Sequence, residues 1–208
     1  MSLHQYIRRH VIVVLVLLLI GYGIVAYIHA VCPEKIGQPH AKGVQVDFAP
    51  VYNEDGSTFH ARLDIGYRQG LLILESVITL FGSWILYKVV LYYCVFFGMK
   101  SWWTYLVDFG CASAIGRLPV RLAGMYVLDY FYIGFRHSTY DFFDFCIGIC
   151  VVGLLVWLIP ACLKYYSYKR KSTKGMGFWE RCKWEMRFSM EMGKMLFRPL
   201  RSWWKDVS

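Results

Sequence analysis

The chain has 208 residues, of which 57% are hydrophobic and 18% aromatic, and its mean hydropathy is +0.40. A soluble domain contains roughly 45–50% apolar residues, so this composition excludes an ordinary soluble protein and predicts an integral membrane protein. The formal net charge is +9, and the stretch from residue 164 onward carries twelve Lys or Arg residues against four Asp or Glu.

The first predicted element is a membrane span at residues 11–30, an apolar run of the length that crosses a bilayer. Arg8 and Arg9 precede it, and positive residues usually flank the cytoplasmic end of a span. A cleaved signal peptide with Cys32 as a lipid-attachment residue is the alternative. Val31 is larger than the residue that cleavage requires at that place, and the apolar run is long. We therefore expect an uncleaved span with a cytoplasmic N-terminus.

Residues 31–69 are polar and mixed in charge, and we expect them outside the membrane. Short alternating pieces such as Val44–Phe48 are typical of strands, and Asn53–Gly56 has the composition of a turn. The segment therefore predicts a small extracytoplasmic β element after the first span.

The next two predicted spans cover Leu71–Tyr93 and Trp102–Leu128. The later one is the less apolar of the two, because it contains four residues that spans rarely hold: Asp108, Arg117, Pro119 and Arg121. The expected topology nevertheless favours a third span at residues 102–128. Both the N-terminus and the basic tail are expected in the cytoplasm, and this requires an even number of spans.

The last predicted span covers Phe142–Leu163, so the sequence divides into a four-span membrane domain at residues 1–163 and a basic cytoplasmic tail at 164–208. The tail contains a predicted amphipathic helix at 177–198. Its charged side chains share one face, and Phe178, Cys182, Trp184, Phe188, Met192 and Leu196 share the other. We expect this helix to bind anionic membrane lipids. Nucleic acid is the less favoured partner, because Trp and Met interleave the charges.

Two carboxylates are the strongest functional signal in the chain. Asp129 is predicted at the outer end of the third span and Asp144 in the outermost turn of the fourth, joined by a short loop. Consecutive helices joined in this way pack antiparallel, so the two carboxylates are expected at one level, where a pair shares one proton. The alternative is that they mark the membrane boundary, and Asp141 adds a third acid to the same loop.

The order of motifs around these acids resembles signal peptidase II, the lipoprotein signal peptidase. Four segments resemble family motifs. Gly116–Leu122 is similar to G-N-x-x-D-R-L and Tyr126–Asp129 to Y-V-V-D. His137 lies where the family has a Trp-His-Phe-like loop, and Tyr140–Gly148 is similar to F-N-x-A-D. Asn53–Phe59 is similar to its N-x-G-A-A-F motif with one extra residue. The chain departs from the family pattern at Arg117, Val120, Asp141 and Phe143.

The resemblance implies an aspartic endopeptidase with four spans and a β cradle, in which Asp129 and Asp144 are catalytic. It implies substrate contacts from Asn53, Gly56, Phe59, Gly116, Arg121 and Asp141, and no metal or organic cofactor. The implied substrate is a prolipoprotein whose cysteine already carries diacylglycerol, cleaved before that cysteine at the bacterial cytoplasmic (inner) membrane. The rival interpretation is a non-catalytic four-span scaffold or subunit of a membrane or secretion complex.

Overall fold

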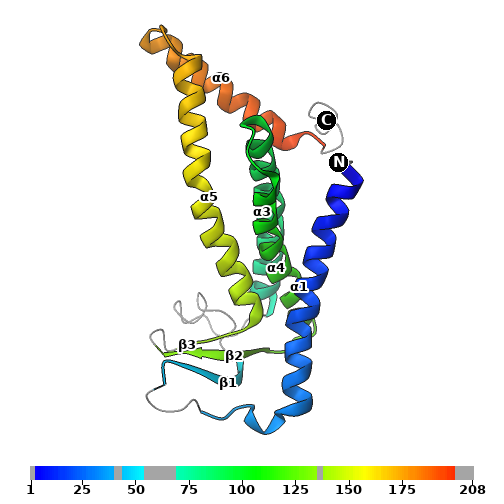
Figure 1. Cartoon of the computed structure of the whole chain (residues 1–208). Coiled ribbons are helices and arrows are strands. Elements are labelled where there is room, and N and C mark those ends of the chain that lie inside the picture. The colour runs from blue at the N-terminus through cyan, green and yellow to red at the C-terminus, as the bar shows by residue number, and fades with distance from the viewer. Residues whose placement is uncertain (1–2, 40–43, 54–68, 135–137, 200–208) are drawn as a thin grey trace.

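The computed structural model describes residues 3–39, 44–53, 69–134 and 138–199. Within these residues four helices run side by side, a small sheet lies at one end of the bundle, and helix α6 crosses the other end (Figure 1). The helices are α1 (Leu3–Val31), α3 (Gln69–Phe96), α4 (Tyr105–Leu122), α5 (Phe142–Ser172) and α6 (Phe178–Phe197), with short 3-10 turns at Pro33–Lys35 and Ser101–Thr104. The beginning of α1 and the helix α6 therefore lie at the same end, opposite the sheet.

Three of the described helices are long and apolar enough to cross a membrane, over His4–Val31, Gln69–Phe96 and Phe142–Ser172. They contain the first, second and fourth predicted spans, and many of their large apolar side chains face outward, as expected in lipid. The chain is a multi-pass membrane protein. Helix α5 continues without interruption beyond the predicted end of the fourth span, to Ser172.

Helix α4 ends earlier than the sequence predicted, at Leu122 instead of Leu128. Gly124 adopts the left-handed conformation, with φ +69°, that commonly closes a helix. Its N–H donates to the Arg121 carbonyl at 3.1 Å, and the next N–H donates to the Val120 carbonyl at 3.0 Å. Helix α4 has 18 residues and carries Asp108, Arg117 and Arg121, so it is not among the helices that are apolar enough for a span.

The sheet has three antiparallel strands in the order β1-β2-β3, formed by Val46–Asn53, Val127–Ile133 and Ser138–Tyr140. The sequence predicted an all-α membrane domain of four helices whose β element follows the first span. This prediction is wrong in part, because two of the three strands come from the segment between α4 and α5. That segment is rich in Val, Ile, Tyr and Phe, which favour strands. A bulge between Phe48 and Val51 accommodates Pro50, which has no N–H to donate.

Helix α4 is the centre of the bundle and packs against α1, α3 and α5. Small residues on α4 permit this close packing. A Cβ added to Gly116 would lie 2.3 Å from the ring of Phe143 on α5, and one added to Gly110 would lie 3.1 Å from the Cys150 sulfur. The close approach of α4 to α5 brings the end of α4 beneath the first turn of α5.

Candidate active site

Asp129 lies on strand β2, not at the end of a helix as the sequence predicted. Its neighbours Leu128 and Tyr130 pack with Ile28 of α1 in a buried cluster. Because strand side chains alternate between the two faces, Asp129 points to the opposite side. It is only 2% exposed, and its Oδ2 accepts a hydrogen bond at 2.8 Å from the side-chain amide of Asn53 on β1.

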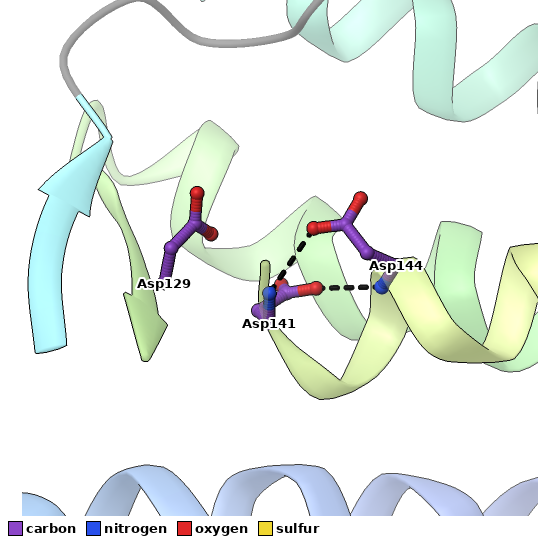
Figure 2. A group of neighbouring side chains, drawn as sticks. All are labelled: Asp129, Asp141 and Asp144. Carbon is purple, nitrogen blue, oxygen red and sulfur yellow. Dashed lines mark hydrogen bonds between the residues drawn. The ribbon is translucent and has the colours of Figure 1, made fainter. Parts of the chain in front are cut away.

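Asp141 and Asp144 form the N-terminal cap of α5. The Asp144 backbone N–H donates to Asp141 Oδ1 at 2.6 Å, and the Asp141 N–H donates to Asp144 Oδ2 at 3.1 Å (Figure 2). This reciprocal pair is a capping box, which satisfies N–H groups that a helix start leaves free. The Phe142 N–H donates in turn to the Tyr130 hydroxyl at 2.9 Å. The orientation of the Asp144 carboxyl is thus fixed by the helix start.

The three carboxyls form one cluster. Asp129, Asp141 and Asp144 each present an oxygen, and these oxygens lie within 4.8 Å of one another (Figure 2). A hairpin and a helix cap bring them together, where the sequence had predicted two helix ends joined by a loop. The two acids predicted as catalytic are therefore close enough to share one water or one proton.

Arg117 of α4 holds the acid cluster from the bundle side. Its Nη2 and Nε donate to the two oxygens of Asp141, at 2.6 and 3.2 Å, and Nη2 also lies 2.6 Å from Asp144 Oδ1. A two-pronged pair between guanidinium and carboxylate is strong and geometrically specific. The sequence had marked Arg117 only as a departure from a family motif.

Arg121 does not reach the carboxyl cluster. Its Nη1 donates to the Leu72 carbonyl at 2.8 Å and to Ser76 Oγ at 2.7 Å, and its Nη2 lies 3.4 Å from Glu75 Oε2, all on α3. Its Nε–H has no hydrogen-bond acceptor among the described residues. A third span over Trp102–Leu128 would have placed Arg121 about two turns before Asp129 on one helix, and the early end of α4 removes that relation.

A polar cavity of about 220 Å³ connects these groups. Asp129, Asp144 and Arg117 line one part of it and Arg121 and Glu75 another, together with Asn53, Ser76, Thr79, Ser113, Thr139 and Tyr140. An apolar groove of about 670 Å³ lies beside it and shares Asp144 and Tyr140 with the cavity; its other walls include Leu106, Phe145, Ile149 and Val152. Asp144 therefore stands where a polar chamber meets an apolar groove.

Burial strongly perturbs the acid on the strand. The pKa of Asp129 is raised from 3.8 to about 8, chiefly by burial and in addition by the carboxyls of Asp141 and Asp144, while Arg117 and the Asn53 amide act in the opposite direction. Burial also raises the pKa of Asp141, against the opposing charge of Arg117. A pKa of about 8 keeps Asp129 largely protonated at neutral pH.

Three clustered carboxylates are also a set that holds hard cations. In this protein the Arg117 guanidinium already donates to Asp141 and contacts Asp144. A cation between these oxygens would lie next to that positive charge. The donor set therefore suits a proton and a guanidinium better than a divalent ion.

The remaining predicted substrate contacts divide into two groups. Gly56 and Phe59 lie outside the residues that the structure describes. Gly116 lies at the crossing of α4 with α1 and α5, where its carbonyl accepts a hydrogen bond from the Tyr22 hydroxyl at 2.8 Å.

The role of Asp141 as a helix cap could have been predicted from the sequence. An acid three residues before another acid at the start of an apolar run is a helix-start signal.

Comparisons with known proteins give a fold but no family. No protein-family profile and no curated protein matches the chain. Among solved structures it is similar to a bacterial membrane enzyme determined in meso at 2.3 Å resolution, with a TM-score of 0.54 and 14% identity over 83% of this chain and 94% of that one. A second bacterial membrane enzyme structure, at 1.9 Å, gives a TM-score of 0.49 and 14% identity over 74% and 94%. The chain thus shares its fold with a bacterial membrane protein.

Proposed function

We propose that the chain is an intramembrane aspartic endopeptidase of the signal peptidase II type. The observation that carries the proposal is the juxtaposition of Asp129 and Asp144, with oxygens within 4.8 Å, at the wall of a polar cavity. The high pKa of Asp129, about 8, supplies one protonated member. The other member lies against the Arg117 cation. This is the acid and base pair that hydrolysis of an amide requires at neutral pH.

The reaction follows from this division of roles. A water held between the two carboxyls loses a proton to Asp144 as its oxygen attacks the scissile carbonyl carbon, and Asp129 donates its proton to the carbonyl oxygen. The proton on Asp144 then passes to the amide nitrogen as the carbon–nitrogen bond breaks. Asp129 recovers its proton when the new carboxylic acid forms.

The proposed substrate is a prolipoprotein already modified with diacylglycerol, cleaved before the lipidated cysteine. The apolar groove beside Asp144 supports this class of substrate, because Phe145, Ile149 and Val152 offer an acyl chain an apolar wall next to the acid. The fold shared with a bacterial membrane enzyme, at a TM-score of 0.54, is consistent with the same proposal.

We further propose four crossings, with the sheet outside a bacterial inner membrane and both termini in the cytoplasm. Helix α4 lies between three helices of spanning length, and at about 1.5 Å per residue its 18 residues extend about 27 Å. Ionisable groups inside a membrane usually pair with one another. Those of α4 do, since Asp108 lies 2.7 Å from His10, Arg117 contacts two acids and Arg121 contacts Glu75.

The decisive experiment is cleavage of a lipidated, fluorescently quenched lipobox peptide by purified protein. Asp129→Asn and Asp144→Asn should each lower turnover by at least ~100-fold, because general acid and base groups typically contribute that much. Asp47→Asn is the matched control, since Asp47 is a half-buried acid on the same sheet outside the cavity. Cleavage by either site variant at the wild-type rate would refute the proposal, as would an inactive wild type that folds and accepts the peptide.

A non-catalytic scaffold is the second candidate, and one observation favours it. Arg117 lies 2.6 Å from Asp144 Oδ1, so one oxygen of the proposed base is already engaged. A scaffold would bind the lipidated peptide without cutting it. Equal binding by wild type and by Asp144→Asn, with no product from either, would select this alternative.

A further inference from the structure

Helix α6 has two apolar faces, and the bundle covers only one of them. Trp184, Phe188, Met192 and Met195 are spaced at four, four and three residues, so they share one face. The ring of Phe188 lies 5.8 Å from that of Phe96 at the end of α3, and Trp184 lies 5.9 Å from Tyr168 on α5. Met192 and Met195 pack on Leu91, Tyr92 and Tyr6. The aromatic face predicted for this helix thus serves to dock it.

The second apolar face points away from the bundle. It consists of Trp179, Met186, Met190 and Phe197, spaced at seven, four and seven residues, and is called the outer stripe below. These side chains are exposed by 75%, 62%, 55% and 89% respectively. Positions 188 and 190 differ by about 200° around a helix, so the outer stripe is opposite the docked face.

A row of basic residues borders the outer stripe. Lys183, Arg187 and Lys194 are exposed and follow it along one edge, about 20–60° around the helix from Met190. Glu180 and Glu191 lie on the far side of that row, and Glu191 accepts a hydrogen bond from Lys194 at 2.6 Å. An apolar stripe edged by Lys and Arg is the pattern of a helix that lies in a membrane interface.

The C-terminal end of α6 lies beside a membrane-spanning helix. The Lys88 ammonium of α3 donates to the carbonyl of Arg198 at 3.3 Å. Lys88 is eight residues before the end of α3, so this contact lies roughly 12 Å below the end of that helix. Figure 1 shows α6 running from the far end of α5 back across the bundle toward the beginning of α1. Met190 and Phe197 therefore belong to the part of α6 that reaches the boundary of the bilayer.

We propose that the outer stripe and its basic border bind an anionic lipid surface, while the opposite face holds α6 on the bundle. The charge and the position of the stripe both favour an anionic lipid surface as its binding partner. The border is positive, and the stripe ends level with Lys88 of the spanning helix α3. Basic residues near a membrane surface each favour anionic lipid by about fivefold. This surface lies at the end of the bundle opposite the acid cluster, so it is independent of the proposed peptidase reaction.

The test uses the full-length protein in nanodiscs of phosphatidylcholine alone or mixed with phosphatidylglycerol. The photo-crosslinker p-benzoylphenylalanine replaces Met190 in one variant and Phe197 in another, and Glu191 in the control, which neighbours Met190 but faces away from the stripe. Mass spectrometry identifies what each position captures. Variants are used only if their unfolding temperature matches that of the wild type, which is why two stripe positions are included.

The expected result is lipid capture at positions 190 and 197 that exceeds capture at 191 severalfold, increases with phosphatidylglycerol and falls with salt. Replacing Lys183, Arg187 and Lys194 together by Gln should remove the preference for phosphatidylglycerol. Capture of a second protein molecule at the stripe would overturn the proposal in favour of a protein-docking face. Lipid capture that ignores both phosphatidylglycerol and salt would overturn it too, as would stronger capture at 191.

Discussion

Replacing Asp129 by asparagine is expected to stabilise the folded protein, and more strongly as the pH rises. The pKa of this carboxyl is about 8 in the folded protein against an ordinary 3.8. Because the folded state binds the proton more tightly than the unfolded chain does, wild-type stability falls as the pH rises between those two values. Each pH unit in that interval costs about 1.4 kcal/mol. The buried carboxyl therefore costs about 4 kcal/mol at pH 7 and about 2 kcal/mol at pH 5.

Asparagine removes this cost because it has no proton to lose. Its side-chain oxygen still accepts the hydrogen bond that Asn53 donates to Asp129 at 2.8 Å. The variant should therefore unfold about 10 °C above the wild type at pH 7 and a few degrees above it at pH 5, at roughly 2–4 °C per kcal/mol. Tryptophan fluorescence during heating in detergent measures both values, and Asp47→Asn should shift neither. A variant that melts at or below the wild-type temperature at pH 7, or whose advantage is the same at both pH values, refutes the reasoning.

Three further predictions follow from the same site. The pH profile of peptide cleavage should fall as the pH rises through about 8, because Asp129 then loses the proton that it donates; a rate that is flat from pH 7 to 9 would contradict this. Arg117→Asn should destabilise the protein by about 3–5 kcal/mol in chemical unfolding, because it leaves buried acids unpaired, and the added change Asp141→Asn should restore much of the loss. Gly116→Ala should cost about 1–3 kcal/mol, because its Cβ would meet an aromatic ring at 2.3 Å; Gly148→Ala, with no atom within 4 Å of its Cβ, is the matched control and should cost nothing measurable.

The sequence predicted the long helices because their signal is local and repeated. Runs of twenty or more apolar residues have few structural alternatives, and three such helices are present where they were expected. The predicted C-terminal end of the third span was wrong, and the reason is also local. Gly124 is a stop signal, and the residues of Val127–Ile133 favour a strand as much as a helix. Hydropathy alone does not distinguish a helix from a strand over these residues.

The two acids of the site could be predicted from the sequence, but their arrangement in space could not. Asp129 and Asp144 could be chosen from their order in the chain, yet their meeting depends on a strand pairing with β1, a partner many residues away. Arg117 and Arg121 are one turn apart on nearly the same face of α4, so the sequence does not decide which of them contacts the acids and which contacts α3. The docked and outer faces of α6 likewise differ only through the bundle that covers one of them.

Under the four-span topology proposed above, the charges of α4 have a consequence for how the protein enters the bilayer. An Arg within a spanning helix is costly to insert unless it is paired, and α4 carries both Arg117 and Arg121 in its last two turns. The partners of Arg121 on α3 are synthesised before it, but those of Arg117, at positions 141 and 144, are synthesised after it. We therefore expect α4 to wait beside the translocation channel until the start of α5 has emerged. The last two helices would then leave the channel as one hairpin, and the acid cluster would be assembled in the same step that completes insertion.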